Sequence, residues 1–134
     1  MKRFILTACL LGVLGTSAPA SDDLADFLGG FRGKKLEKAI EKAEQHPLGN
    51  EKNPIRVNMP EGQRAYLRRL RCSDGKAPSY QREGSIGAGP FGSIVDVYIV
   101  DCGEALPGKV SVYLDMYHPE HEENRPVSTF TIER

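Results

Sequence analysis

The stretch that decides the fold lies between residues 93 and 118, where two segments alternate between apolar and polar side chains. They read SIVDVYIVDC (residues 93–102) and KVSVYLDMYH (residues 109–118). A period of two is typical of β-strands, because successive side chains of a strand point to opposite faces of the sheet. The residues between them include Gly and Pro, which suit a short connection. We therefore predict antiparallel strands over 94–101 and 109–117, followed by a shorter strand over 128–132.

Each of the two longer strands is expected to present one apolar face and one face with acids and tyrosines. The apolar faces would form the core through Val95, Val97, Ile99, Val110, Val112, Leu114 and Met116. The opposite face would carry Asp96, Tyr98, Tyr113, Asp115 and Tyr117. Because tyrosine covers a large contact area at low entropic cost, this side is a candidate recognition face. The alternative is that the N-terminal helix covers it and makes it a second, polar layer of the core.

A helix is predicted upstream of the strands, over residues 61–71. The segment begins with Pro60 and Glu61, and both residue types are common at a helix start. One face of the helix would be apolar, with Tyr66, Leu67 and Leu70. Another face would form a basic ridge, with Arg64, Arg68 and Arg71. Guanidinium groups bind carboxylate and phosphate, so the ridge is a candidate for anion contacts. A solvated helix face is the alternative.

The remaining elements complete an α+β domain. A short strand is expected over residues 55–57, and an N-terminal helix before His46-Pro47, because proline disfavours helix at the residue before it. The helix has a thin apolar stripe and many charges, so we assign residues 21–47 to an N-terminal arm. The single folded domain is then residues 48–134. The predicted fold class is α+β, with an N-terminal helix, a second short helix, a small mostly antiparallel sheet and one disulfide.

The first twenty residues, MKRFILTACLLGVLGTSAPA, have the three parts of a secretory signal peptide. Basic residues come first, an apolar run follows over residues 4–14, and small residues precede a cleavage site after Ala20. Cys9 lies in a lipobox-like setting, but the apolar run continues beyond it, which disfavours lipid anchoring there. We expect an exported protein, periplasmic or secreted, with no transmembrane segment after cleavage.

Two cysteines, Cys72 and Cys102, remain after this cleavage. An even number of cysteines in an oxidising compartment is most simply explained by a disulfide. Cys72 ends the predicted helix and Cys102 ends the first long strand, and the apolar faces of these two elements must meet to form a core. A Cys72–Cys102 bridge is therefore expected.

Charge and motifs exclude two large classes of ligand. The chain has 18 basic and 18 acidic residues, without the basic excess of a nucleic-acid-binding protein. Residues 87–92, GAGPFG, match the dinucleotide fingerprint G-x-G-x-x-G. That loop requires a helix after it to hold the pyrophosphate, whereas a strand is predicted here. No cofactor is expected.

Candidate chemical groups are sparse, and an enzyme is the less favoured class. A small envelope hydrolase could use Asp96, Asp115 or His118, if the two acids face each other across the strand pair. A periplasmic metal-binding protein could use His118 and His121, although zinc sites need three or four converging ligands. No catalytic residue is assigned from the sequence.

Several segments together resemble a family of small secreted bacterial proteins, some of which are lipoproteins. They are GNEKNPIRV, RAYLRRLRC, SYQREGSIGAGPFG, VDVYIV, VYLDMYHP and the late FTI. Some members carry a label as a deoxy-octulosonate phosphate aldolase, but this chain is far shorter than the roughly 250 residues of such a barrel. The resemblance implies a single domain from about residue 48 and supplies no catalytic residues. The favoured function is an exported, non-enzymatic protein that binds an unknown protein or envelope component.

Overall fold

The computed structural model describes residues 29–134, so the predicted signal peptide, Cys9 and the start of the arm lie outside the described residues. The described elements are α2 (Gly33–Ala43), β1 (Ile55–Arg56), α3 (Met59–Arg69), β2 (Leu70–Arg71), β3 (Ser79–Ala88), β4 (Ile94–Asp101), β5 (Lys109–Asp115) and β6 (Thr131–Ile132). Together they form the predicted α+β fold. None of the helices in this part of the chain has the length and apolar character needed to cross a membrane.

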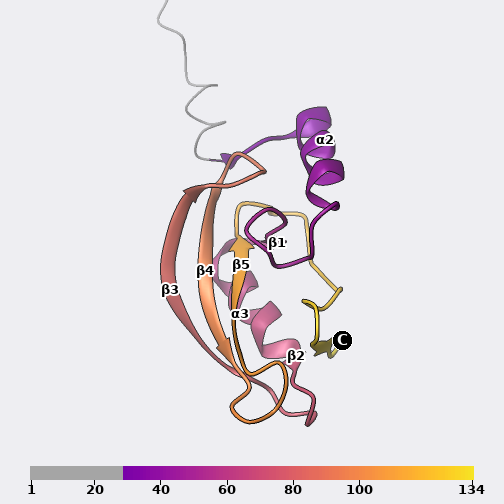
Figure 1. The fold of residues 1–134 in the computed structure, drawn as a ribbon. Coiled ribbons are helices and arrows are strands. Elements are labelled where there is room, and N and C mark those ends of the chain that lie inside the picture. The colour runs from indigo at the N-terminus through magenta and orange to yellow at the C-terminus, as the bar shows by residue number, and fades with distance from the viewer. Residues whose placement is uncertain (1–28) are drawn as a thin grey trace, which may run out of the picture.

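The main sheet has four strands in the order β1-β5-β4-β3. β4 pairs antiparallel with both β3 and β5, and β1 pairs parallel with β5. Helix α3 lies against one face of this sheet, and α2 lies at one end, beyond the turn that joins β3 to β4 (Figure 1). The predicted strand over 94–101 is confirmed, and its partner ends at Asp115 rather than at residue 117.

Strand β3 was not predicted, and the C-terminal strand has a different partner from the expected one. Residues 79–88 are polar and rich in glycine, yet they form a ten-residue edge strand with two irregularities in its pairing to β4. Most of its side chains are exposed, so it lacks the alternating apolar pattern of a half-buried strand. Strand β6 pairs with β2 in a separate two-stranded sheet.

The register of β4 and β5 divides the predicted recognition face between the two sides of the sheet. Tyr98 pairs with Val112 and Asp96 with Leu114, whereas Val95 pairs with Asp115. Asp96 and Tyr98 therefore share a face with the apolar residues of β5, and the expected set of five side chains does not form one surface. A shift of one residue in the pairing register moves every side chain of a strand to the other face of the sheet. The alternating pattern of the sequence alone does not determine this register.

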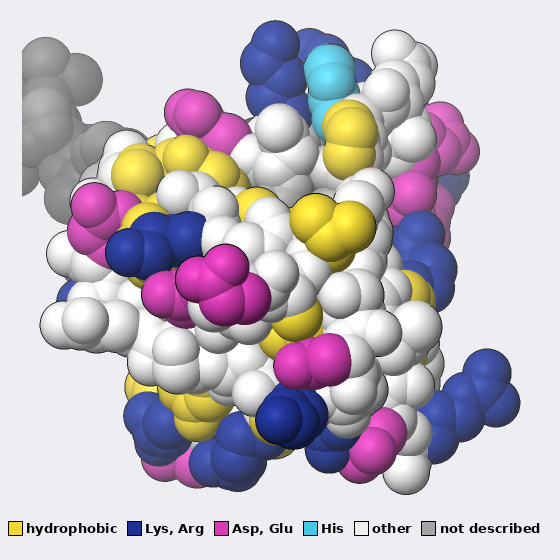
Figure 2. Space-filling view, turned by 60° about the horizontal axis from the view of Figure 1, so that its bottom comes forward, with side chains coloured by type: hydrophobic (Ala, Val, Ile, Leu, Met, Phe, Trp, Pro, Cys, Tyr) yellow, Lys and Arg dark blue, Asp and Glu magenta, His cyan; other side chains and the backbone are white. Residues whose placement is uncertain are grey.

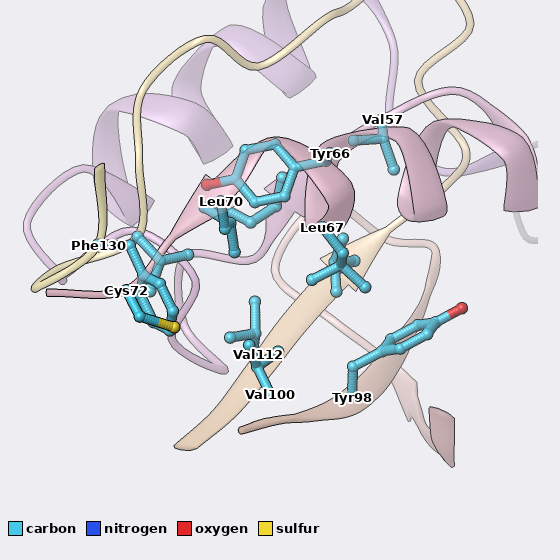
Figure 3. Packing of buried hydrophobic residues seen from close by; sticks show 12 residues of the cluster. Val57, Tyr66, Leu67, Leu70, Cys72, Tyr98, Val100, Val112 and Phe130 are labelled. Carbon is cyan, nitrogen blue, oxygen red and sulfur yellow. The ribbon is translucent and has the colours of Figure 1, made fainter. Parts of the chain in front are cut away.

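The core lies between this sheet and α3. Tyr98 and Val100 of β4 and Val112 of β5 pack toward the helix (Figure 3). From the helix side, Tyr66 and Leu67 complete the same cluster, as predicted. The face that carries Tyr98 is thus covered by α3, not by the N-terminal helix.

Helix α3 ends at Arg69, two residues earlier than predicted. Leu70 is extended, and Leu70–Arg71 forms β2. The basic ridge is therefore not a helix face: Arg71 lies beyond the helix and pairs with Glu133, and Arg64 pairs with Glu61 at 2.9 Å. The disulfide is confirmed, with a Cα–Cα distance of 5.8 Å between Cys72 and Cys102.

The loop with the G-x-G-x-x-G pattern contacts Phe31, at the start of the described N-terminal arm. Strand β4 follows the loop, as predicted. Phe31 donates its backbone N–H to the carbonyl of Phe91 at 2.7 Å. Gly92 has a φ of +78°, and a Cβ there would lie 2.5 Å from the Phe31 ring. The glycine is needed both for its backbone conformation and for this close approach.

Candidate functional site

Asp96 connects the sheet to α3 rather than lining a cleft. Its Oδ2 accepts a hydrogen bond from Gln63 Nε2 at 2.9 Å, and its Oδ1 accepts one from Arg82 at 2.8 Å. Tyr98 in turn donates its hydroxyl to Gln63 Oε1 at 3.0 Å. Burial raises the pKa of Tyr98, which keeps this hydroxyl protonated as a donor. The group is a satisfied polar layer between helix and sheet.

Asp115 lies on the opposite face of the sheet, so the expectation that it faces Asp96 is wrong. It is fully buried and accepts hydrogen bonds from Ser93 Oγ and from the backbone N–H of Tyr117. His118 Nε2 lies 3.3 Å from Asp115 Oδ2, yet it makes no hydrogen bond and is buried. The carboxylate thus stands between Ser93 and His118. In a nucleophile–base–acid relay the histidine would stand between the other two.

The two candidate metal ligands face different carboxylates. His118 faces Asp115, whereas His121 Nε2 lies 3.5 Å from Glu123 Oε2. Among residues 29–134, no group of three or more His, Cys, Asp or Glu side chains is arranged to hold a metal ion. Within residues 29–134, no third ligand therefore converges with His118 and His121, as the metal-binding hypothesis requires.

Glu123 is the centre of an ionic cluster that ties the C-terminal segment to α2. Arg125 bonds both oxygens of Glu123, at 3.0 Å each, and both oxygens of Glu44, also at 3.0 Å. Burial acts to raise the pKa of Glu123, but hydrogen bonds from His121 and Arg125 outweigh it and hold the pKa far below its usual value. The Arg125 hydrogen bond likewise lowers the pKa of Glu44.

This cluster predicts a definite pH dependence. A carboxyl whose pKa is lower in the folded state stabilises the protein above its unfolded pKa, and this contribution is lost as pH falls toward the folded pKa. We expect the free energy of unfolding to fall as pH decreases below about 4.5. Glu123→Gln should lower stability at neutral pH and flatten this fall, as measured by urea unfolding at several pH values. The control is Glu122→Gln, because Glu122 is exposed and pairs with Arg69 only at 3.7 Å, and this variant should retain the fall in stability that Glu123→Gln loses. Equal profiles for all three proteins would contradict the assignment.

A groove with a cationic lining lies beside residues 117–121, and we call it the Arg56 groove. It has a volume of about 560 Å³ and lies between the start of α2 and the turn after β5. Its lining residues are Gly29, Phe31, Arg32, Gly33, Leu36, Arg56, Tyr117, His118, Pro119, Glu120 and His121. Of the residues predicted from the sequence, Tyr117, His118 and His121 are brought together here.

Arg56 is held in this groove by β1, whose pairing with β5 buries Ile55 and Val57 on either side of it. The side chain is half-buried, and the ring of Phe91 lies 5.8 Å from its guanidinium carbon. Burial lowers the pKa of Arg56, and the longer-range attraction of Glu123, Glu44 and Asp115 opposes this shift. Among the half-buried arginines of residues 29–134, Arg56 alone makes no ion pair or side-chain hydrogen bond; Arg64, Arg69 and Arg71 are all paired.

The first turn of α2 adds to the positive potential at this groove. Arg32 is its N-cap and makes no side-chain cap hydrogen bond, and the first turn contains no acid. The free backbone N–H groups of a helix start carry a partial positive charge and attract anions. Glu120 is the one acidic side chain in the lining. The groove therefore has an excess of hydrogen-bond donors and positive charge.

Sequence reasoning missed Arg56 and Arg32. The available signal was the single arginine between apolar residues in PIRV (residues 54–57), since a charged residue inside a short buried strand needs a partner. The other charged side chains do not form a comparable cluster on the face that Figure 2 shows, where acidic and basic side chains are interspersed.

Comparison with protein-family models, with curated proteins and with solved structures finds no match to this chain. The resemblance to small secreted bacterial proteins stays a prediction.

Proposed function

We propose that this is an exported, non-enzymatic binding protein whose Arg56 groove takes a small anionic ligand bearing a carboxylate or phosphate group. One observation carries the proposal: Arg56 is half-buried and makes no direct ion pair or side-chain hydrogen bond with residues 29–134, while Glu123, Glu44 and Asp115 attract it only from a distance. A charge withdrawn from water without a partner destabilises the protein. A bound carboxylate or phosphate would remove that cost, because the planar guanidinium donates two parallel hydrogen bonds to such groups.

The surroundings of Arg56 support an anion over a neutral ligand. Arg32, the start of α2 and His121 all line the groove together with Arg56. The volume of about 560 Å³ falls within the usual range for small-molecule sites. Ser93, Asp115 and His118 do not form a relay, which supports binding without catalysis.

Export is supported by the covalent structure and by the N-terminal sequence. A disulfide between Cys72 and Cys102 persists in oxidising compartments such as the periplasm. The first twenty residues have the pattern of a signal peptide. We infer that the ligand is a component of the envelope or of the medium.

Substitution of Arg56 tests the site. Succinate and inorganic phosphate serve as probes, and isothermal titration calorimetry measures their affinity. We expect Arg56→Gln to weaken binding roughly 10- to 100-fold, the loss of a charge-assisted hydrogen-bonded pair. The matched control is Arg68→Gln on the exposed side of α3, which should bind like the unaltered protein. A loss of affinity in Arg68→Gln with none in Arg56→Gln would place the anion site on the helix instead.

A further inference from the structure

A second hollow lies on the other side of Phe31, between α2 and the turn that joins β3 to β4, and we call it the lysine groove. Its volume is about 650 Å³. Its lining residues are Phe31, Lys38, Ala39, Lys42, Ala43, His46, Glu51, Lys52, Ile86, Ala88, Gly89 and Pro90. It shares only Phe31 with the Arg56 groove.

The lining of the lysine groove divides into apolar and basic side chains. Ala39 and Ala43 are small residues on one face of α2, and they leave room above the helix. Ile86, an apolar side chain that is 44% exposed, also lines the groove. Together with Phe31 and Pro90, these residues give the groove an apolar portion, which small-molecule sites commonly have.

The basic side chains of this groove have no acidic partners in the described chain. Lys38, Lys42 and Lys52 make no ion pair with residues 29–134, although Lys109 elsewhere does. Glu51 is the one acid among the lining residues. The groove therefore combines an apolar surface with a net positive charge, and its complement is a molecule with an apolar body and an anionic end.

We propose that the lysine groove binds a single-chain amphiphile with an anionic head, of the class of the long-chain fatty acids. The acyl chain lies along Phe31, Ala39 and Ile86 and is removed from water there. The carboxylate pairs with Lys38 and Lys42, whose flexible stems let the ammonium groups reach it. The proposal concerns a second ligand and does not depend on the anion at Arg56.

Binding of dodecanoate, measured by calorimetry below its micellar concentration, tests this inference on the full exported protein. Dodecanol has the same chain without the charge, and acetate has the charge without the chain. We expect dodecanoate to bind with one-to-one stoichiometry, and each comparison compound to bind at least about tenfold more weakly, because each lacks one of the two complementary parts. Acetate binding as tightly as dodecanoate would overturn the proposal, as would a failure of dodecanoate to saturate.

Two variants locate the bound molecule. K38Q/K42Q removes the charge, and Ile86→Asp places a like charge beside the acyl chain; each is expected to weaken dodecanoate binding about tenfold or more. The matched control is Leu106→Asp, because Leu106 is an exposed apolar residue in the β4–β5 connection and does not line the groove. Equal affinity in all three variants would overturn the assignment to this groove.

A competitor distinguishes a fatty acid from a peptide. The chain's own residues 21–28, SDDLADFL, are acidic and apolar, so a synthetic peptide of this sequence has the same two chemical features. We expect the peptide not to displace dodecanoate. Displacement by the peptide at a lower concentration than that of the fatty acid would assign the groove to a polypeptide segment and overturn the proposal.

Discussion

Replacing both Cys72 and Cys102 by serine is expected to lower the free energy of unfolding by about 3–4 kcal/mol. The bridge closes a loop with a sequence separation of 30 residues, which contains all of β3 and the glycine-rich turn. The unfolded chain without this restraint gains conformational entropy, and glycine-rich segments gain the most. Urea unfolding at neutral pH measures the difference. Stability within about 1 kcal/mol of the unaltered protein would contradict the account, because the bridge would then restrain little.

The reduced protein provides a check that needs no substitution. Dithiothreitol should destabilise the unaltered protein and leave the double serine variant unchanged. A similar loss in both proteins would show that the reductant acts elsewhere. The same comparison by mass spectrometry should find Cys72 and Cys102 protected from alkylation until the protein is reduced.

Asp115→Ala is expected to destabilise the protein by about 1–3 kcal/mol, the usual cost of leaving a buried hydrogen-bond donor without its acceptor. Asp115 is fully buried and accepts hydrogen bonds from Ser93 and from the Tyr117 backbone, with His118 beside it. Its removal leaves buried donors without acceptors. Asp101→Ala, at the more exposed end of β4, should cost less than about 1 kcal/mol in the same urea experiment.

A second substitution of Asp115 distinguishes a structural role of this residue from a catalytic one. The account assigns it to the fold, so ligand binding at the Arg56 groove should persist in Asp115→Asn, which keeps the shape of the side chain. The hydrolase alternative predicts a different result. If the unaltered protein hydrolyses a substrate, and Asp115→Asn is equally stable but inactive toward that substrate, the hydrolase alternative is supported. Stability of Asp115→Ala equal to that of Asp101→Ala would contradict the structural role.

The parts of the fold that could be predicted are those with a strong local pattern. Alternation over residues 94–101 and 109–115 identifies β4 and β5, and the apolar spacing of Tyr66 and Leu67 identifies the buried face of α3. The disulfide followed from the requirement that these elements pack together. For the two strands and the helix, a short segment contains enough information to fix its own structure, and the disulfide was inferred from how these elements pack.

The parts that could not be predicted depend on contacts between distant segments. Strand β3 is polar because it is an edge strand, and its pairing with β4 is what makes it extended. The register of β4 against β5 pairs Asp96 with Leu114, and both faces of β4 bury apolar side chains, so alternation does not show which face meets α3. Asp96 and Tyr98 were therefore assigned to a surface, whereas α3 covers them.

The candidate site also combines residues that a local sequence motif identifies with one residue, Arg56, whose neighbours come from distant segments. His118 and His121 are conspicuous in the sequence, and each lies beside a carboxylate only two or three residues away, Asp115 for His118 and Glu123 for His121. Arg56 is inconspicuous, and only the docking of Phe31 onto the Gly92 loop places the start of α2 beside it. A groove formed by three separate segments leaves no motif in any one of them.

The central claim is that Arg56 binds the anionic group of a ligand, and the most direct measurement observes that side chain. In a ¹⁵N–¹H NMR titration with succinate and then with phosphate, the account predicts a saturable shift of the Arg56 Nε–Hε signal. The Arg68 signal should stay unchanged, and Arg56→Gln should abolish the saturable response. Saturable binding of either probe that leaves the Arg56 signal unmoved would contradict the account.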